Sequence, residues 1–266
     1  MKDIQNEYDS RGIDIQKVGI KNFDIPLKIR RKNNSNQVVN AVANVSVSLP
    51  KHYKGTHMSR FVEVLTEWQN KDMLGSDLKG CIELVVKKLL ANSGELNLSF
   101  KYFIDKPAPV SNQISPICYD CSFTSILSDF GTEKENYKFI LGVKVPVTTL
   151  CPCSKEISDY GAHNQRTLVS VNVSYDRNEH IWIEDLISDI EECASCSIYS
   201  LLKREDEKYV TEKAYNNPKF VEDVLRDIVI MLRKNDIVKE FEVDCESLES
   251  IHNHSAWAYQ KEEKFF

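Results

Sequence analysis

The highest density of reactive side chains lies in residues 150–166, LCPCSKEISDYGAHNQR. Cys151 and His163 stand twelve residues apart in this segment. A thiolate and an imidazole that lie close together can bind a divalent ion such as Zn²⁺, and they can also act as a nucleophile with its base. Because Arg166 and other polar side chains follow at once, the segment predicts a functional loop, with Arg166 as a candidate substrate-binding residue.

Residues 203–223, KREDEKYVTEKAYNNPKFVED, carry the acidic side chains of a second candidate segment. One of these carboxylates could complete a metal site with Cys151 and His163, although most of the charges are typical of a solvated loop. Glu222 differs because it falls in the first turn of a predicted apolar helix. Its carboxylate either complements the helix dipole or accepts two ring N–H groups from a guanine edge.

Two further segments concentrate imidazoles and cations. In IHNHSAW, His252 and His254 are two residues apart and would share one face of a strand. The pattern is compatible with proton transfer, with metal binding and with a purely structural role. In KHYKGTHMSR, Lys54, His57 and Arg60 gather around the start of a predicted helix. Cations beside free helix N–H groups are typical of a polyphosphate site. A surface turn followed by a capped helix explains the same residues equally well.

Two C-x-x-C pairs, Cys118–Cys121 and Cys193–Cys196, are interpreted as structural. The two knuckles of a zinc ribbon are about 15–20 residues apart, whereas Cys193 follows Cys121 by 72 residues. The second pair also falls inside a predicted helix with periodic apolar neighbours. The sequence contains neither a P-loop nor a G-x-G-x-x-G motif, so a nucleotide must bind by other means.

The elements that position these residues follow from the spacing of apolar side chains. For the first half, the spacing predicts strands at 17–31 (interrupted at Pro26), 38–49, 96–102 and 117–129, and helices at 58–69 and 77–91. The strand at 38–49 shows the strict alternation of a half-buried strand. The element order of this half is ββααββ.

The second half repeats that order. The spacing predicts strands at 137–149, 167–176, 237–246 and 255–261, a long amphipathic helix at 183–203, a charged loop at 204–217 and a helix at 218–234. The repetition is one of element order and not of letters. A linker at 130–136 separates the halves, so the predicted modules are residues 1–132 and residues 133–266.

The predicted fold is therefore α+β, with two tandem ββααββ modules that each form an antiparallel sheet with two helices on one face. A module this thin has open sheet edges, which proteins usually hide by pairing with other subunits. We therefore expect a homo-oligomer.

The composition is that of an ordinary globular protein. Hydrophobic residues make up 42% and charged residues 28% of the 266 residues, and the formal net charge is −6. This acidic balance argues against a nucleic-acid or membrane surface. The polar start MKDIQNEYDSRG lacks an apolar signal core, and no apolar run approaches the length of a membrane span. We expect a cytoplasmic protein with reduced cysteines.

Four of these segments resemble the type IB GTP cyclohydrolase family: KGTHMSRF at 54–61, LCPCSKEISDYGAHNQR at 150–166, DEKYVTEKAYNNPKFVED at 206–223 and IHNHSA at 251–256. They keep their order over nearly the whole chain, and the long middle motif is highly specific. The resemblance implies a tunnelling fold (T-fold), bimodular in each subunit, and a homotetramer with sites at subunit interfaces. It also implies conversion of GTP and water to formate and 7,8-dihydroneopterin triphosphate, the first step of tetrahydrofolate biosynthesis.

The same resemblance implies a metal site. Cys151, His163 and Glu207 would hold one divalent metal per site, and Cys151 would also be catalytic. Zn²⁺, Mn²⁺ and Fe²⁺ all suit this donor set. The family commonly has Pro before the Asp–Glu pair, where this chain has Glu205. Two glutamates therefore compete for the metal position, and Glu207 is the one predicted.

The resemblance also implies substrate-binding and proton-transfer roles. Glu222 would anchor the guanine, and His252 and His254 would transfer protons. The remaining predicted substrate contacts are the cationic side chains Lys54, His57, Arg60 and Arg166.

Three alternatives stay open. A related T-fold enzyme, the nitrile reductase of the queuosine pathway, uses a cysteine nucleophile and NADPH without a metal. The archaeal cyclohydrolase branch yields a cyclic phosphate product. A non-catalytic, zinc-stabilised binding protein would unfold on chelation instead of merely losing activity.

Overall fold

The computed structural model describes residues 4–5, 7–69, 71–73, 75–176 and 178–264. The chain forms two compact units. Unit 1 consists of Met1–Lys101, Ser122–Leu141 and Tyr175–His180. Unit 2 consists of Tyr102–Cys121, Gly142–Ser174 and Ile181–Phe266. The predicted module boundary between residues 132 and 133 stays a prediction.

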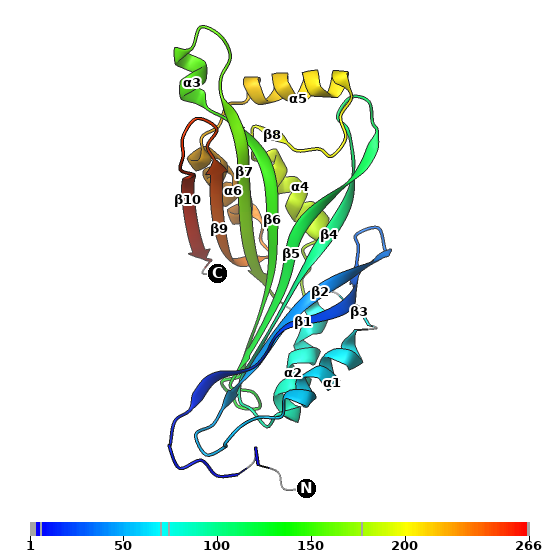
Figure 1. Cartoon of the computed structure of the whole chain (residues 1–266), viewed down its shortest axis with the longest axis vertical. Helices are drawn as coiled ribbons and strands as arrows, with labels where there is room; N and C mark the ends of the chain where they lie inside the picture. Colours follow the sequence, from blue (N-terminus) through cyan, green and yellow to red (C-terminus); the bar gives the residue numbers. More distant parts are fainter. Residues whose placement is uncertain (1–3, 6, 70, 74, 177, 265–266) are drawn as a thin grey trace. The chain divides into compact units, whose positions relative to one another are not determined.

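Unit 1 is a sheet with two α-helices (Figure 1). Its own strands are β1 (Ile15–Arg30), β2 (Asn36–Leu49) and the two-residue β3 (Asp72–Met73), and it shares β4 (Gly94–Pro107), β5 (Ile114–Ser128) and β6 (Asn136–Leu150) with unit 2. The strand order in unit 1 is β3-β1-β2-β4-β5-β6. The helices are α1 (Met58–Trp68), the short 3₁₀ helix η1 (Gly75–Asp77) and α2 (Leu78–Lys88). Helices α1 and α2 pack together, and α1 contacts β1.

The predicted interruption at Pro26 is wrong. Pro26 pairs with Asn40 in the antiparallel β1–β2 ladder, and β1 continues to Arg30. On the other side of β1, the described part of β3 pairs only with Lys28 and Ile29. Proline lacks an N–H donor, and it is tolerated here because no second ladder uses that position.

Unit 2 carries the candidate residues of the second half of the chain. Its further strands are β7 (Asn164–Tyr175), β8 (Cys196–Ser197), β9 (Val238–Leu248) and β10 (Ala256–Glu263). Its helices are α3 (Pro152–Ile157), α4 (Ile183–Glu192), α5 (Arg204–Asn216) and α6 (Val221–Lys234). The strand order is β10-β9-β7-β6-β5-β4, and β8 pairs with β6. Helix α6 packs on β9 and β10, while α4 and α5 both contact β8.

The core of unit 2 follows from the alternation read in the sequence. From Thr167 onward every second residue of β7 is buried, and so is the apolar stripe of α6. These buried side chains include Val169, Val171, Val173, Val224, Ile228 and Leu232. The ladders between β1 and β2, β2 and β4, β6 and β8, and β9 and β10 are antiparallel. The α+β prediction is therefore confirmed, and the tandem repeat stays a prediction.

The long helix predicted at 183–203 is wrong, because α4 ends at Glu192. Main-chain carbonyls beyond a helix end need donors. Here side chains supply them: Asn217 Nδ2 donates to the carbonyls of residues 194 and 195 at 2.9 and 3.2 Å, and Lys219 Nζ donates to that of residue 193 at 2.8 Å. These donors replace the hydrogen bonds of further helical turns.

The second C-x-x-C pair therefore lies outside the helix in which it was predicted. Cys193 follows the last residue of α4, and Cys196 pairs with Thr148 as part of β8. Both thiols are buried. Burial raises the pKa of the Cys193 thiol to about 11, so this thiol is protonated at neutral pH.

The charged loop predicted at 204–217 is also wrong, because this segment is helix α5. Its Glu and Lys residues are good helix formers. Because most of its side chains are charged or polar, the segment lacks the repeated apolar spacing from which a helix is predicted. Val210 and Ala214, four residues apart, pack inward against Leu150 and Cys196. The tertiary contact thus selects a helix that hydrophobic spacing alone did not predict.

Asp206 determines where α5 begins. Its side chain is fully buried, and its carboxylate accepts the Lys203 N–H at 2.8 Å. It also accepts the main-chain N–H groups of Val110 and Ser111, both at 2.9 Å, and the Ser111 hydroxyl at 2.6 Å. The loop between β4 and β5 is thereby fastened to the first turn of α5.

We predict that Asp206→Asn lowers the melting temperature at pH 7, because an amide presents N–H groups to donors that need an acceptor. Burial raises the pKa of Asp206, but the hydrogen bonds from Ser111, Lys203 and Val110 outweigh it and hold the pKa below the ordinary 3.8. A depressed pKa stabilises the fold above pH 3.8 and loses that effect as the pH falls. The difference between variant and wild type should shrink in acid.

Thermal unfolding from pH 7 to pH 3 tests this, with Glu205→Gln as the control. Glu205 is the exposed neighbouring carboxylate in the same first turn. Equal melting temperatures for Asp206→Asn and Glu205→Gln at pH 7 would contradict the role of Asp206.

Candidate functional site

The end of β6 is a meeting point of three chain segments. The Leu150 N–H donates to Ser195 Oγ at 3.2 Å, and the Leu150 carbonyl accepts the Lys219 N–H at 3.0 Å. The Cys151 N–H donates to the His163 carbonyl at 3.1 Å. These main-chain bonds bring the two ends of the 151–163 loop together and place them next to the segment that leads into α6.

Cys151 precedes the first turn of α3 with an extended backbone, and its Sγ accepts the Ser154 N–H at 3.4 Å. Ser154 Oγ donates to the Cys151 carbonyl at 3.1 Å and accepts the His163 N–H at 3.2 Å. Cys151 is half-buried, whereas Cys153 is exposed. The loop thus holds the Cys151 sulfur in a defined position that solvent can reach.

The tautomer of His163 follows from its neighbours. Gln165 Nε2 donates to the Glu249 carboxylate at 3.2 Å, so Gln165 Oε1 is the atom that faces His163 Nδ1, at 3.1 Å. An amide oxygen can only accept, and Nδ1 must therefore carry the proton. In the neutral ring of this tautomer, Nε2 is the nitrogen with the lone pair. A ligating histidine that donates its other N–H to a fixed acceptor is the usual arrangement at metal sites.

The loop between β9 and β10 lies beside His163. Ser250 Oγ stands 3.5 Å from His163 Nδ1, and Glu249 contacts Gln165. His252 and His254 belong to this loop and precede β10, so neither lies on a strand. Both are exposed, and their rings stack with centroids 5.1 Å apart.

Glu222 lies in the first turn of α6, as predicted, and is exposed. It follows Lys219, whose N–H is bonded to Leu150, by three residues. The start of α6 therefore lies in the neighbourhood of the 151–163 loop. The described residues show no hydrogen bond or ion pair from the Glu222 carboxylate.

Glu207 is exposed in the first turn of α5. It is the C-terminal end of α5 that contacts α3. Lys155 Nζ of α3 donates to the carbonyl of Tyr215 at 2.5 Å. Glu207 stands eight residues before Tyr215, which is roughly 12 Å along a helix that rises 1.5 Å per residue. The described residues contain no group of three His, Cys, Asp or Glu side chains that could hold a metal ion.

The donor chemistry thus fits a divalent metal in part. Cys151 Sγ and His163 Nε2 belong to adjacent backbones, and the His163 tautomer suits ligation. Glu207 is not gathered with them in this structure. The predicted set of three ligands stays a prediction.

The cationic cluster Lys54, His57 and Arg60 lies in unit 1. Lys54 Nζ pairs with the Glu7 carboxylate at 3.2 Å, and Arg60 donates to the Lys88 carbonyl at 2.9 Å, at the end of α2. His57 directly precedes α1. These contacts give Lys54 and Arg60 structural partners, and their phosphate-binding role stays a prediction.

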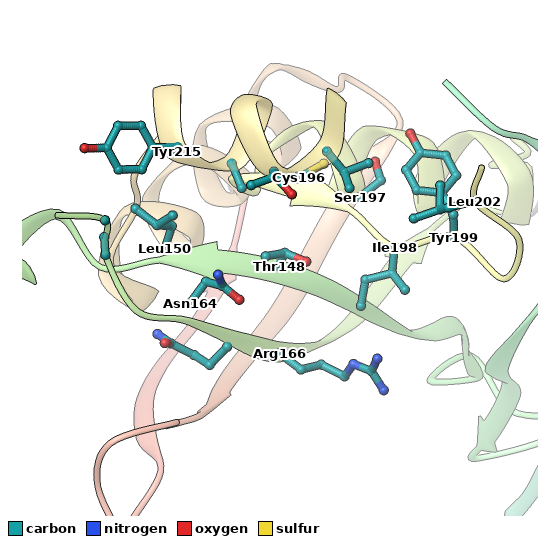
Figure 2. Close-up of a pocket in the computed structure, with 16 residues that line it drawn as sticks. Thr148, Leu150, Asn164, Arg166, Cys196, Ser197, Ile198, Tyr199, Leu202 and Tyr215 are labelled. Carbon is teal, nitrogen blue, oxygen red and sulfur yellow. The ribbon is translucent and has the colours of Figure 1, made fainter. Parts of the chain in front are cut away.

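A pocket of about 460 Å³ opens beneath α5, and we call it the α5 pocket (Figure 2). Arg166 and Asn164 of β7 line it together with Thr148 and Leu150 of β6. Figure 2 shows Tyr215 at one end and Tyr199 and Leu202 at the other. The other lining residues are Gly161, Ala162, Gln165, Cys196, Ser197, Ile198, Val210, Thr211 and Ala214. Among these residues, a substrate-binding role was predicted only for Arg166. The lining residues at 196–202 and 210–215 fall in segments that were predicted as a helix and as a charged loop.

Residues 1–258 match the protein-family model described as type I GTP cyclohydrolase FolE2. A GTP cyclohydrolase FolE2 from Geobacter sp. (strain M21) is 49% identical over 258 residues, which cover 97% of this chain and 93% of the relative. The protein of the same name from Syntrophus aciditrophicus is 48% identical over 264 residues, with 99% and 100% covered. The similarity therefore extends over essentially the whole chain.

Solved structures of urate oxidases share the fold. The enzyme from Bacillus subtilis 168 superposes with a TM-score of 0.53 at 7% identity and covers 94% of this chain and 99% of its own. Urate oxidase from Bacillus sp. TB-90 gives 0.55 at 9% identity, with 94% and 100% covered. The tunnelling fold predicted from the sequence is confirmed. In the described part of the chain, no helix is long and apolar enough to cross a membrane.

We predict that Gln165→Leu weakens Zn²⁺ or Mn²⁺ binding about 10- to 100-fold, because the His163 ring loses the acceptor that fixes its tautomer. Competition with a chromogenic chelator measures the affinity, and circular dichroism checks the fold. Gln260→Leu, on β10, is the matched control and should bind the metal like wild type. Undiminished affinity in Gln165→Leu would show that His163 does not ligate through Nε2.

Proposed function

The chain belongs to the type I GTP cyclohydrolase FolE2 family, and from that premise we propose that it hydrolyses GTP at C8 of the guanine ring. The products are formate and 7,8-dihydroneopterin triphosphate, and the reaction is the first step of tetrahydrofolate biosynthesis. The observation that carries this conclusion is 49% identity to a GTP cyclohydrolase FolE2 over 97% of the chain. The fold alone does not carry it, since urate oxidases share that fold.

Cys151 and His163 are the proposed ligands of one divalent ion, with Glu207 as the third. When bound, such an ion supplies the Lewis acidity that lowers the pKa of a water molecule. Zn²⁺, Mn²⁺ and Fe²⁺ all suit a sulfur, nitrogen and oxygen donor set. Gln165 and Glu249 support the site by holding the His163 ring through Nδ1.

The remaining candidate residues act on the substrate itself. Glu222 accepts the N1–H and the 2-amino N–H of guanine, which orients C8 toward Cys151 and His163. Water adds to C8, and the exposed imidazoles of His252 and His254 supply protons at N7 and N9 as the five-membered ring opens. A second water releases C8 as formate. The ribose then rearranges and closes onto the freed amine with loss of water, so one water is consumed overall.

Assembly into a homotetramer with sites at subunit interfaces is part of the proposal, as are the tandem ββααββ modules. The support is an open edge: β10 ends the strand order of unit 2, and its exposed Trp257 and Tyr259 stack with ring centroids 6.0 Å apart. Uncovered edge strands with aromatic side chains usually pair with another chain. Cytoplasmic location stays a prediction from the sequence.

The activity is tested by incubating the protein with GTP, with and without EDTA followed by Mn²⁺ or Zn²⁺. We expect metal-dependent formate release and, after oxidation, the fluorescence of neopterin triphosphate. A cyclic phosphate product would indicate the archaeal type of reaction. No formate with any metal, together with NADPH consumption on a nitrile-bearing deazaguanine, would replace this proposal by the nitrile reductase.

Replacement of Cys151 by Ala is predicted to abolish formate release, because the sulfur is both proposed ligand and catalytic group. The fold should persist, since the Cys151 main-chain bonds do not involve the side chain. Cys153→Ala, two residues on and exposed, is the control and should retain activity. Near-normal formate release by Cys151→Ala would refute the metal-site assignment.

Glu222→Gln is predicted to lower kcat/KM for GTP about 10- to 100-fold, the effect of losing one charge-assisted hydrogen bond of about 1.5–3 kcal/mol. Inosine triphosphate lacks the 2-amino group, so its kcat/KM should fall less. Glu212→Gln on α5 serves as the control for removal of a surface carboxylate. Equal losses for GTP and inosine triphosphate would exclude a contact between Glu222 and the 2-amino group of guanine.

A further inference from the structure

The chemistry of the α5 pocket is that of an anion site. None of its sixteen lining residues carries a carboxylate, and Arg166 is the single charged one. Further hydroxyl and amide donors come from Thr148, Asn164, Ser197, Tyr199 and Tyr215. Gln165 and Thr211 also line the pocket, but they already donate to Glu249 and to the Glu207 carbonyl. The volume of about 460 Å³ lies within the range of small-molecule sites. A pocket with many neutral donors and a guanidinium suits phosphate oxygens.

The guanidinium of Arg166 is available for a ligand. Arg166 is exposed, and no hydrogen bond or ion pair joins it to any other residue that the structure describes. Of the other three arginines of unit 2, Arg226 pairs with Asp223 at 3.1 Å and Arg233 pairs with Glu262, whereas Arg204 lies on α5 and does not line the pocket. A planar guanidinium with free N–H groups is the usual partner of a phosphate.

A second cation lies close to the pocket. Lys213 of α5 acts electrostatically on Cys196, a lining residue, and lowers its pKa against the opposing and larger effect of burial. Its ammonium stands 6.0 Å from the Tyr209 ring and has no carboxylate partner among the described residues. Arg166 and Lys213 are therefore two cationic side chains at or near the pocket, although the chain as a whole carries −6.

The wall of the pocket is held by a buried ion pair. Lys106 Nζ lies 2.5 Å from Glu191 Oε2, donates to the Ile198 carbonyl at 3.1 Å and stands 4.4 Å from the centre of the Tyr199 ring. Tyr119 donates its hydroxyl to the other oxygen of Glu191 at 2.8 Å. Lys106 is neutralised by this pair, and its contacts fasten the pocket residues Ile198 and Tyr199. This part of the pocket wall is therefore held in place before any ligand binds.

We propose that the α5 pocket binds the phosphate chain of the substrate nucleotide, with Arg166 as its main contact and Lys213 as a second cation. This inference rests on the proposed function, which supplies the nucleotide. The base itself fits the pocket less well, because a carboxylate is the best acceptor for the two N–H groups of a guanine edge and the lining has none. Leu150, Ala162 and Gln165 line the end nearest the 151–163 loop, so a nucleotide with its base at that loop can extend its phosphates beneath α5.

This assignment differs from the one predicted for Lys54, His57 and Arg60. The ammonium of Lys54 already pairs with Glu7, and the guanidinium of Arg60 already donates to the Lys88 carbonyl. A phosphate at Lys54 would compete with the Glu7 carboxylate for the same ammonium, and at Arg60 it would have to share the guanidinium with the Lys88 carbonyl. At Arg166 no such contact has to be broken.

Binding without turnover tests the proposal. Isothermal titration at low ionic strength would compare GTP, guanosine and inorganic tripolyphosphate, each supplied with excess Mg²⁺, on wild type, Arg166→Gln and Lys213→Gln. We expect Arg166→Gln to weaken GTP and tripolyphosphate about 10- to 100-fold and to leave guanosine unchanged. Lys213→Gln should have a smaller, salt-sensitive effect of the same sign.

Lys208→Gln is the matched control, because Lys208 lies on α5, pairs with Glu212 at 3.8 Å and does not line the pocket. Wild-type tripolyphosphate affinity in Arg166→Gln, or a loss confined to Lys54→Gln, would overturn the proposal. Since no catalysis is measured, an absence of formate release with tripolyphosphate binding intact would refute the proposed activity and leave the anion site standing. Arg166→Gln must also keep the wild-type melting temperature, which shows that the fold is intact.

Discussion

Satisfying the main-chain polar groups at Leu150 and Cys151 is the constraint on which the rest of unit 2 depends. A strand that leaves its sheet exposes N–H and C=O groups, and each costs free energy unless it finds a partner. Here the partners are Ser195, Lys219 and His163, which come from three different segments. Binding these segments to one point brings together the cysteine, the imidazole and the start of the helix that carries Glu222.

Buried polar side chains extend this logic around the site. Asp206 fastens α5 to the loop between β4 and β5, and the Lys106–Glu191 pair fastens the wall of the α5 pocket. Across the neighbouring strands β6, β7 and β9, the hydroxyls of Thr149, Thr167 and Ser247 form a buried chain with oxygen distances of 2.8 and 2.5 Å. Such groups contribute little net stability when satisfied but are costly when a partner is missing. These groups therefore fix the positions of the segments they join more than they stabilise the folded state.

The comparison with urate oxidases separates fold from chemistry. An identity of 7–9% preserves the arrangement of strands and helices, because many apolar residues can fill the same layers. The Cys151–His163 loop, by contrast, depends on specific residues: Ser154, Gln165 and Glu249 each make a directed hydrogen bond that an apolar residue could not replace. The residues that distinguish this chain chemically are consequently expected in this loop and not in the sheet.

The sequence by itself determined the elements with strong periodicity, such as β2, β7 and α6, and the short-range motif that holds Cys151 and His163. Both kinds of feature depend on the spacing of residues within one segment, and that spacing can be read directly from the amino-acid sequence. Tertiary structure alone decided that residues 204–216 form a helix, that α4 stops at Glu192, and that Ile198 and Tyr199 line a pocket. In each case a distant partner (Ser111, Asn217 or Lys106) supplies the hydrogen bond, and its distance along the chain hides it from any local pattern.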